Sequence, residues 1–405
     1  MADPTPEPGT PSPFRIRSLT LPVYVPTFLF SLGQGAIIPV IPLFATDLGS
    51  TVAFAALAVG LRGFGTMLFD VPAGLMVGKI GERWSMLVAS FMLIAVALVT
   101  TVITSPIIYA AAVFVMGCAW SIWLLARLTY VSDRAPVEVR GRALALIGGT
   151  NRAGHFVGPA IGGFLGVFLG LEYVFWMHAI LGLAASVVMF IMVKENTGTS
   201  IHTDDSMYRR LVAVVVDHRR IFMTAGVAAI CLQVLRNVRQ AVIPLWGEAI
   251  GLDAAEIGII FAISSGFDML LFYPMGIIMD RYGRKWAGVP AMIVLAISMA
   301  ALPLTDSFLT LTVVGILAGL GNGISSGINM TLGADFSPPG SRGEFLGVWR
   351  LVSDVGTAGG PIVIAAIASA TTLGVACVAT GGIGIIGAIV MITLVPEPLK
   401  RRVPT

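Results

Sequence analysis

The amino-acid sequence predicts an all-α membrane protein in which twelve transmembrane helices form two pseudo-symmetric bundles of six. Three observations predict this fold: an apolar composition, twelve apolar runs and an internal repeat. Of the 405 residues, 56% are hydrophobic and only 12% are charged, and the mean hydropathy is +0.91. A soluble domain carries about 25% charged residues. Much of the apolar surface must therefore face lipid rather than water.

Twelve apolar runs approach or exceed the length of about 20 residues that crosses a bilayer. The first bundle, residues 20–193, would contain spans at 20–46, 52–78, 86–105, 107–131, 143–169 and 173–193. The second bundle, residues 221–394, would contain spans at 221–246, 255–279, 287–305, 308–332, 344–368 and 371–394.

The remaining segments are polar or rich in proline. Residues 1–19 and 395–405 are predicted to be cytoplasmic tails, the first of them disordered. Residues 194–220 are predicted to be a cytoplasmic linker that ends in a helix lying along the membrane surface.

The distribution of basic residues predicts the orientation. Six of the 25 lysines and arginines lie within spans, and the other nineteen all fall on cytoplasmic segments if the N-terminus is cytoplasmic. We therefore expect a monomer of the cell inner membrane with both termini in the cytoplasm. The external loops carry acidic residues instead, namely Asp47, Glu172, Glu248, Asp253, Glu256 and Asp306.

The internal repeat has a period of 202 residues. Shifting the sequence by this offset aligns Pro42 with Pro244 and Gly81 with Gly283, and no gap is needed along almost the whole chain. Two halves with the same orientation are the parallel repeat of secondary transporters, which hold substrate where the halves meet.

Two motifs resemble those of a known family. The segment Gly276–Lys285, GIIMDRYGRK, is similar to the signature loop between the second and third helices of a half in the major facilitator superfamily. The glycines and proline of residues 154–163 resemble the fifth-helix motif of the drug–proton antiporters in that superfamily. The resemblance implies the major facilitator fold and its drug or metabolite efflux branch. The chain departs from the family patterns at Gly78, Glu82, Val113 and Ala145.

In the resembling fold, the first, fourth, seventh and tenth helices line a central cavity. The seventh span carries one polar stripe at helical spacing, and polar or aromatic residues occupy the other three spans. The substrate-binding residues predicted in this way are Gln34, Trp120, Trp123, Arg127, Gln233, Arg236, Asn237, Gln240, Asn322 and Asn329. The alternative is that these polar groups only satisfy one another inside the bundle.

The charges within spans are six arginines and three aspartates: Arg62, Arg127, Arg152, Arg236, Arg239, Arg350, Asp70, Asp268 and Asp354. A mid-membrane arginine costs about 2.5–3.5 kcal/mol on insertion scales, so these side chains must face water, form pairs or reach the interface. The excess of three positive charges favours a substrate with a carboxylate, phosphate or phenolate. Proton coupling would use one of the three aspartates or, less readily, His155.

Coupling or gating is predicted for Arg62, Asp70, Arg152, Asp268, Asp280, Arg284 and Asp354. We expect ion pairs between the halves, Arg62 with Asp354 and Arg152 with Asp268, unless each arginine pairs within its own half. By resemblance, Asp280 would face the N-terminus of the fifth helix.

No motif predicts an enzyme, a metal site, a cofactor or nucleic-acid binding. Residues 323–327 fit G-x-S-x-G, but a nucleophile elbow needs a strand-to-helix turn, and an uninterrupted helix is expected there. The sequence predicts a secondary active transporter that moves a small amphipathic organic compound, a drug or metabolite, by alternating access, with export by proton antiport. The alternative is uptake, symport or uniport of a small organic anion.

Overall fold

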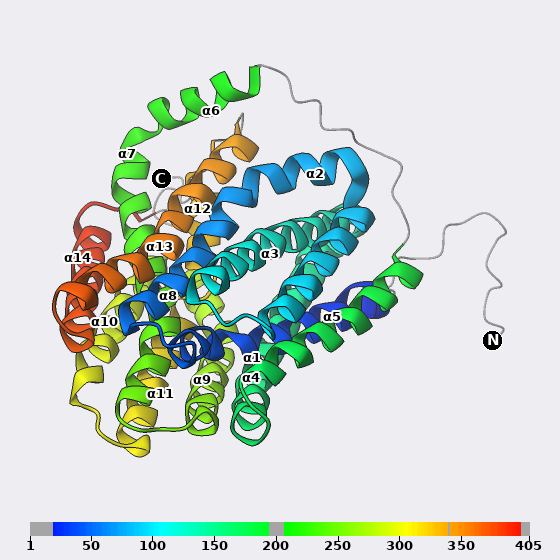
Figure 1. Ribbon diagram of the computed structural model, residues 1–405. Helices are drawn as coiled ribbons and strands as arrows, with labels where there is room; N and C mark the ends of the chain where they lie inside the picture. The colour runs from blue at the N-terminus through cyan, green and yellow to red at the C-terminus, as the bar shows by residue number, and fades with distance from the viewer. Residues whose placement is uncertain (1–18, 194–205, 339–340, 398–405) are drawn as a thin grey trace, which may run out of the picture.

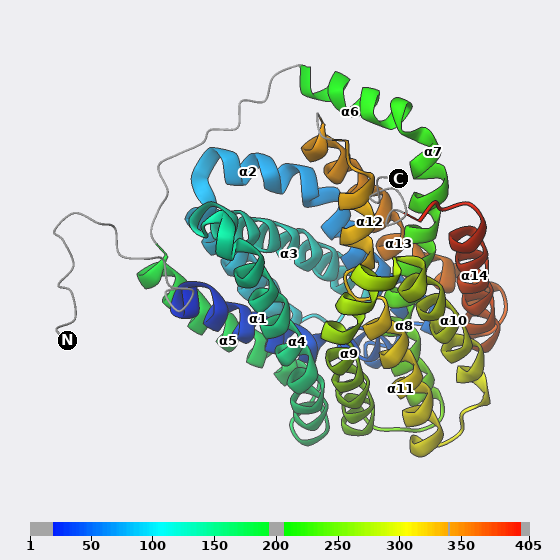
Figure 2. The same ribbon diagram turned by 180° about the vertical axis from the view of Figure 1, so that it is seen from behind.

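The computed structural model describes residues 19–193, 206–338 and 341–397, and every regular element in these ranges is helical (Figures 1 and 2). Most of the two predicted tails and the first part of the predicted linker lie outside the described residues.

The first bundle begins with a π-helical turn, Thr20–Tyr24. Its helices are α1 Val25–Asp47, α2 Val52–Thr100, α3 Pro106–Arg134, α4 Val137–Phe168 and α5 Glu172–Met192. Two short helices, α6 Ser206–Asp217 and α7 Arg219–Ile221, connect the bundles. A π-helical turn, Phe222–Gly226, opens the second bundle. The helices of the second bundle are α8 Val227–Ala249, α9 Ala254–Tyr282, α10 Lys285–Ala301, α11 Phe308–Ile324, α12 Ile328–Phe336, α13 Arg342–Ala370 and α14 Leu373–Thr393.

Ten helical segments of the described chain are long and apolar enough to cross a membrane. One of them, α2, contains two spans, because Gly81 interrupts its 49 residues with φ 80° and ψ 167°. The helix α4, 32 residues long, is not among the ten, and it carries the polar residues Asn151 and Arg152 mid-helix. Dividing α2 and adding α4 brings the ten to the predicted twelve.

The repeat is visible in the backbone. Gly81 and Gly283, 202 residues apart, both adopt positive φ, at 80° and 109°, where the chain turns between consecutive spans. Gly49 and Gly251 form a second such pair, with φ of 81° and 85°. Residues with a Cβ rarely adopt these values. The two bundles therefore share turn geometry as well as sequence.

One expectation about the tenth span was wrong. The span is not continuous, because α11 ends at Ile324 and α12 begins only at Ile328. Gly327 lies between them in the left-handed conformation, with φ 81°. This break lies within the predicted span 308–332, and it brings Ser326 into contact with charged residues of two neighbouring helices.

The bundles meet along two helix pairs, α2 with α13 and α4 with α9. Small residues allow close approach there: a Cβ on Gly63 would lie 2.9 Å from the carbonyl oxygen of Thr357. A Cβ on Gly258 of α9 would lie closer still to the carbonyl oxygen of Pro159 of α4.

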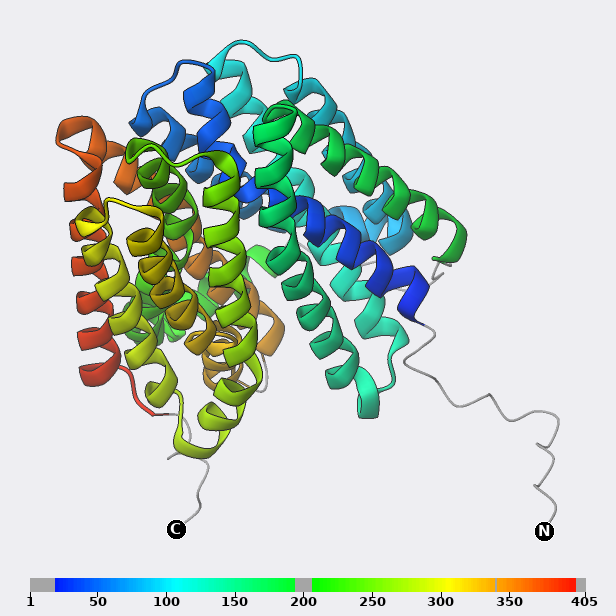
Figure 3. The same ribbon diagram turned by 90° about the horizontal axis from the view of Figure 1, so that it is seen from below.

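The two ends of the molecule differ. We call the end where α1 begins and α14 ends the terminal end, and the opposite end the loop end. At the loop end the Thr46 hydroxyl donates a hydrogen bond to the Glu248 carboxylate, at 2.9 Å, and joins α1 to α8. Toward the terminal end the ribbons of the two bundles separate (Figure 3).

Candidate functional site

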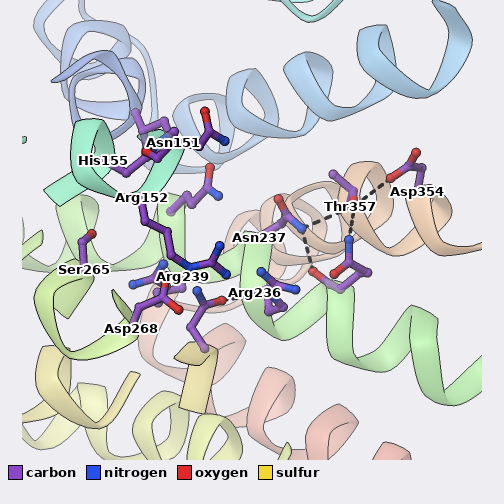
Figure 4. Close-up of a pocket in the computed structure, with 14 residues that line it drawn as sticks. Asn151, Arg152, His155, Arg236, Asn237, Arg239, Ser265, Asp268, Asp354 and Thr357 are labelled. Carbon is purple, nitrogen blue, oxygen red and sulfur yellow. Dashed lines mark hydrogen bonds between the residues drawn. The ribbon is translucent and has the colours of Figure 1, made fainter. Parts of the chain in front are cut away.

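A cavity of about 380 Å³ lies between the two bundles. We call it the central cavity. Residues from α1, α4, α8, α9, α11 and α13 surround it, and most of them are polar or charged (Figure 4). Its lining consists of Ile38, Asn151, Arg152, His155, Gln233, Arg236, Asn237, Arg239, Gln240, Ser265, Asp268, Asn322, Asp354 and Thr357.

The polar stripe predicted on the seventh span lies on the central cavity. All four of its residues, Gln233, Arg236, Asn237 and Gln240, belong to the lining. Arg236 Nε donates to Asn322 Oδ1 at 2.8 Å, which fixes the guanidinium plane. Among the described residues only this nitrogen of Arg236 is hydrogen-bonded, so its two terminal nitrogens are available to a ligand.

Two further arginines join Arg236 in the central cavity. Arg152 comes from α4 of the first bundle; it donates to Ser326 Oγ at 2.8 Å and lies 4.0 Å from the centre of the Phe272 ring. Arg239 comes from α8 and donates to Ser264 Oγ at 2.9 Å. The two bundles therefore both contribute a cation to one site.

Asp268 is the carboxylate that lies among these arginines (Figure 4). It interacts electrostatically with Arg152, Arg236 and Arg239. Its Oδ1 also accepts a hydrogen bond from Ser326 at 3.3 Å. Three guanidinium groups around one carboxylate leave this part of the cavity with an excess of two positive charges.

Asp354 lies at the edge of the central cavity and belongs to a second polar group. We call Asp70, Ser121, Arg350 and Asp354 the interface cluster. Arg350 Nη2 lies 2.8 Å from Asp70 Oδ1, and Arg350 Nε lies 3.7 Å from Asp354 Oδ2. Ser121 Oγ also donates to Asp70 Oδ1, at 2.5 Å. This cluster joins α2 of the first bundle to α13 of the second.

Five predicted substrate-binding residues do not line the central cavity. Gln34 is fully buried and accepts a hydrogen bond from Arg62. Asn329 accepts hydrogen bonds from Trp349 and Ser353, at 3.0 Å each, and so ties α12 to α13.

The other three, Trp120, Trp123 and Arg127, form part of the core of the first bundle. Trp123 is fully buried and stacks on Trp120 with 5.3 Å between ring centres. The Arg127 guanidinium lies 4.3 Å from the Trp123 ring centre and donates to Thr27 Oγ1 at 3.2 Å. A cation on an aromatic face inside a bundle is a packing arrangement, and none of these three residues is part of the cavity lining.

The prediction of two ion pairs between the bundles was wrong for the described conformation. Among the described residues neither Arg62 with Asp354 nor Arg152 with Asp268 forms an ion pair within 4.0 Å. Arg62 turns to Gln34 of its own bundle, and Ser326 stands between Arg152 and Asp268. Asp70 and Arg350 do form an ion pair across this interface. It uses the predicted helices but lies nearer the terminal end, by about two turns on α2 and about one turn on α13.

The predicted contact of Asp280 with α4 is not made in this conformation, in the part of the chain that the structure describes. Asp280 is 79% exposed, and Arg284 lies 3.7 Å away. Arg284 itself is buried and pairs with Asp335 at 2.6 Å, so it anchors a turn within the second bundle.

Five polar lining residues were not predicted to bind substrate: Asn151, Ser265 and Thr357 were missed, whereas Arg239 was predicted only as an embedded charge and His155 only as a possible proton site. Four of them lie three residues from a predicted site residue, a spacing that places side chains on one helix face. Asn151 is next to Arg152, and its carbonyl oxygen contacts His155 Nδ1 at 2.9 Å. Helical spacing around each embedded charge was therefore the signal that could have found them.

Comparison with known proteins gives the following. The sequence pattern of the Major Facilitator Superfamily matches residues 23–239 and 225–405. The multidrug resistance protein MdtG of Salmonella typhimurium is 23% identical over 394 residues, covering 92% of this chain and 94% of that protein. The hexuronate transporter of Bacillus subtilis is 33% identical over 171 residues, covering 42% of this chain and 40% of that protein. The solved structure of the nucleoside transporter NupG superposes with a TM-score of 0.80 at 13% identity, covering 94% of this chain and all of that one.

Proposed function

The chain belongs to the major facilitator superfamily, and from this premise we propose that it exports small amphipathic organic anions by alternating access, in exchange for protons. It is an integral membrane transporter of small molecules and not an enzyme. The observation that carries the proposal is the group of three arginines around one carboxylate in the central cavity.

The charge of the cavity favours an anionic substrate. Unlike charges attract strongly where water is largely excluded, so a carboxylate or phosphate would gain from meeting Arg152, Arg236 and Arg239. A guanidinium group also matches these anions in shape, because it can donate two parallel hydrogen bonds. An organic cation would meet the same excess positive charge and be disfavoured.

The position of the arginines suits alternating access. Arg152 belongs to the first bundle, whereas Arg236 and Arg239 belong to the second. A substrate that contacts all three would favour the arrangement of bundles in which they converge. We propose that the terminal end faces the cytoplasm of the inner membrane, that the protein acts as a monomer, and that the described conformation receives substrate from the cytoplasm.

Export is supported by similarity to MdtG, whose name describes multidrug resistance and whose match spans nearly the whole chain. A second candidate function is uptake of a sugar-acid-like anion by symport. It is favoured by the similarity to the hexuronate transporter, whose sequence identity to this chain is higher than that of MdtG but extends over less than half of the chain. Both candidates use the same arginine-lined cavity and differ in direction.

A transport assay in proteoliposomes separates these functions. A pH gradient of either sign is imposed, and the movement of a panel of radiolabelled carboxylates, amines and neutral compounds is followed. Export by antiport predicts that carboxylates move against the proton flux. Movement with the proton flux would support symport instead. Preferential transport of amines would contradict the proposed substrate class.

A further inference from the structure

The interface cluster contains more negative than positive charge. Two carboxylates, Asp70 and Asp354, face one guanidinium group, Arg350. The carboxylates are largely shielded from solvent, with side-chain exposures of 10% for Asp70 and 15% for Asp354. Their side chains are also within hydrogen-bonding reach of each other. Two ionised carboxylates repel at such a distance, so one of them is expected to hold a proton.

The hydrogen bonds of Asp70 indicate that one of its carboxylate oxygens lacks a donor. Its Oδ1 accepts from Ser121 and from Arg350, whereas its buried Oδ2 has no partner among the described residues. A buried acceptor without a donor is unfavourable. A proton on either carboxyl would turn the contact of two acceptors into a hydrogen bond.

The surrounding helices supply polar but uncharged neighbours. Ser121 comes from α3, and Thr357 of α13 donates to Asp354 Oδ1 at 3.3 Å. From α8, Gln233 and Asn237 reach Thr357 but not the carboxylates. The charged groups that act on Asp354 in the described part of the chain are Asp70 and Arg350. With one proton, the two carboxylates and the guanidinium group are together neutral.

We infer that Asp70 and Asp354 share one proton across the α2–α13 interface, and that this proton is the one exchanged for substrate. The second half of the inference rests on the proposed function. Binding joins one proton to the carboxylate pair and forms a hydrogen bond between the two bundles. Release leaves both carboxylates ionised, and they push α2 and α13 apart. The proton therefore stabilises the described conformation, in which the pair is in contact.

A chain of hydrogen bonds connects this proton to the central cavity. Gln233 Nε2 donates to Thr357 Oγ1 at 3.1 Å, and Thr357 in turn donates to Asp354. Both Gln233 and Thr357 line the cavity. A substrate that engages Gln233 alters the hydrogen bond that Thr357 can offer to Asp354. Substrate and proton would thus influence each other through three side chains.

The test measures the separation of the bundles against pH in the absence of substrate. Spin labels are placed on Gly141→Cys and Gly343→Cys, which are equivalent positions at the terminal end where a side chain meets open space. The native cysteines, Cys118, Cys231 and Cys377, are buried and are replaced. Between about pH 5 and pH 8 the wild-type distance distribution should shift away from the described separation as the carboxylate pair loses its proton.

Asp70→Asn and Asp354→Asn should each abolish this pH response and keep the described separation, because an amide can donate the hydrogen bond at any pH. Asp306→Asn, which changes an exposed carboxylate at the loop end, is the matched control and should retain the response. An unchanged pH response in both cluster variants would overturn the inference.

Infrared spectroscopy provides a second readout. Its main result comes from the wild-type protein, so it does not require that any variant folds. A protonated carboxyl band at neutral pH is expected in the wild type, and it should be missing from whichever cluster variant folds. The absence of this band from the wild type would also overturn the inference. Neither measurement uses substrate. A negative result here would therefore not contradict anion binding in the arginine-lined cavity, and a negative result in the anion transport assay would not contradict the shared proton.

Discussion

Thr46 and Glu248 occupy the same position in the two halves of the repeat, 202 residues apart, and they are hydrogen-bonded to each other at 2.9 Å. Equivalent residues meet only where the pseudo-twofold axis passes between them. The contact therefore closes the loop end on that axis, while the bundles separate toward the terminal end (Figure 3).

Thr46→Val should weaken this closure, because the variant keeps the side-chain size but loses the donor. A net loss of about 1 kcal/mol would increase the population open at the loop end about fivefold. The measurement is the labelling rate of Ser265→Cys in the central cavity by a thiol reagent that cannot cross the membrane and is added at the loop end. Thr46→Ser keeps the hydroxyl and should label at the original rate. Equal labelling rates with Thr46, Thr46→Val and Thr46→Ser would show that the hydrogen bond to Glu248 does not keep the loop end closed.

Arg236 should dominate the affinity for organic anions. Arg236→Ala removes a charge that the structure leaves available to ligand, and an expected loss of about 1.5–3 kcal/mol corresponds to an affinity weaker by about 10- to 150-fold. Arg236→Lys keeps the charge but loses the planar geometry and the Asn322 bond, so its loss should be smaller. Calorimetric titration measures both.

Arg127→Lys is the matched control, since Arg127 is a buried arginine outside the cavity. Its anion affinity should equal that of the wild type even where thermal stability falls. Wild-type affinity in both Arg236 variants would remove this residue from the binding site.

Asp280→Asn should shift the population toward the conformation described here. Asp280 is exposed and makes no described contact with α4, so the predicted charge–dipole contact could form only when the terminal end closes. Such contacts contribute about 0.3–1 kcal/mol. The distance between labels at Gly141→Cys and Gly343→Cys reports the shift, and Gly78→Asp should move it in the opposite direction. If neither variant changes the distance, the contact between Asp280 and the N-terminus of α4 that the resemblance implies does not form in this chain.

The turns at Gly81 and Gly283 should differ in stability. In the second bundle the buried Arg284 pairs with Asp335 at 2.6 Å. The equivalent residues of the first bundle are Glu82 and Asp133, two acidic side chains within hydrogen-bonding reach. Glu82→Gln removes the like charge and keeps a hydrogen bond to Asp133. It should stabilise the protein by about 0.5–1 kcal/mol.

Thermal unfolding in detergent measures this effect. Burial and the neighbouring Asp133 raise the pKa of Glu82, so the gain should be largest at high pH, where Glu82 is ionised, and should shrink as Glu82 becomes protonated. Arg284→Gln, at the equivalent position, should lower the unfolding temperature. A Glu82→Gln variant less stable than the wild type at every pH would contradict the assigned repulsion.

The sequence predicted the fold because its signals are local or strictly periodic. Each span needs only its own apolar residues, and the repeat located the turns at Gly81 and Gly283 through the offset alone. The cavity face of α8 was also predictable, since Gln233, Arg236, Asn237 and Gln240 share one helix face.

The partners of the embedded charges were not predictable. Arg62 could face either α13 or α1, and its choice of Gln34 depends on helix rotation, which a continuous apolar run does not fix. The same uncertainty misplaced Trp123, which packs against Phe30 with 4.9 Å between ring centres. The break before Gly327 depends on one left-handed residue, and glycines are common in membrane helices without such a role.

The most direct test of the account is binding of three matched compounds to the purified protein: an aromatic carboxylate, its neutral amide and the corresponding amine. The carboxylate should bind at least about tenfold more tightly than the amide, a difference of about 1.4 kcal/mol, and the amine should bind most weakly. In Arg236→Ala the advantage of the carboxylate should largely disappear. Tighter binding of the amine, or equal binding of all three compounds by the wild type, would contradict an anion site formed by Arg152, Arg236 and Arg239.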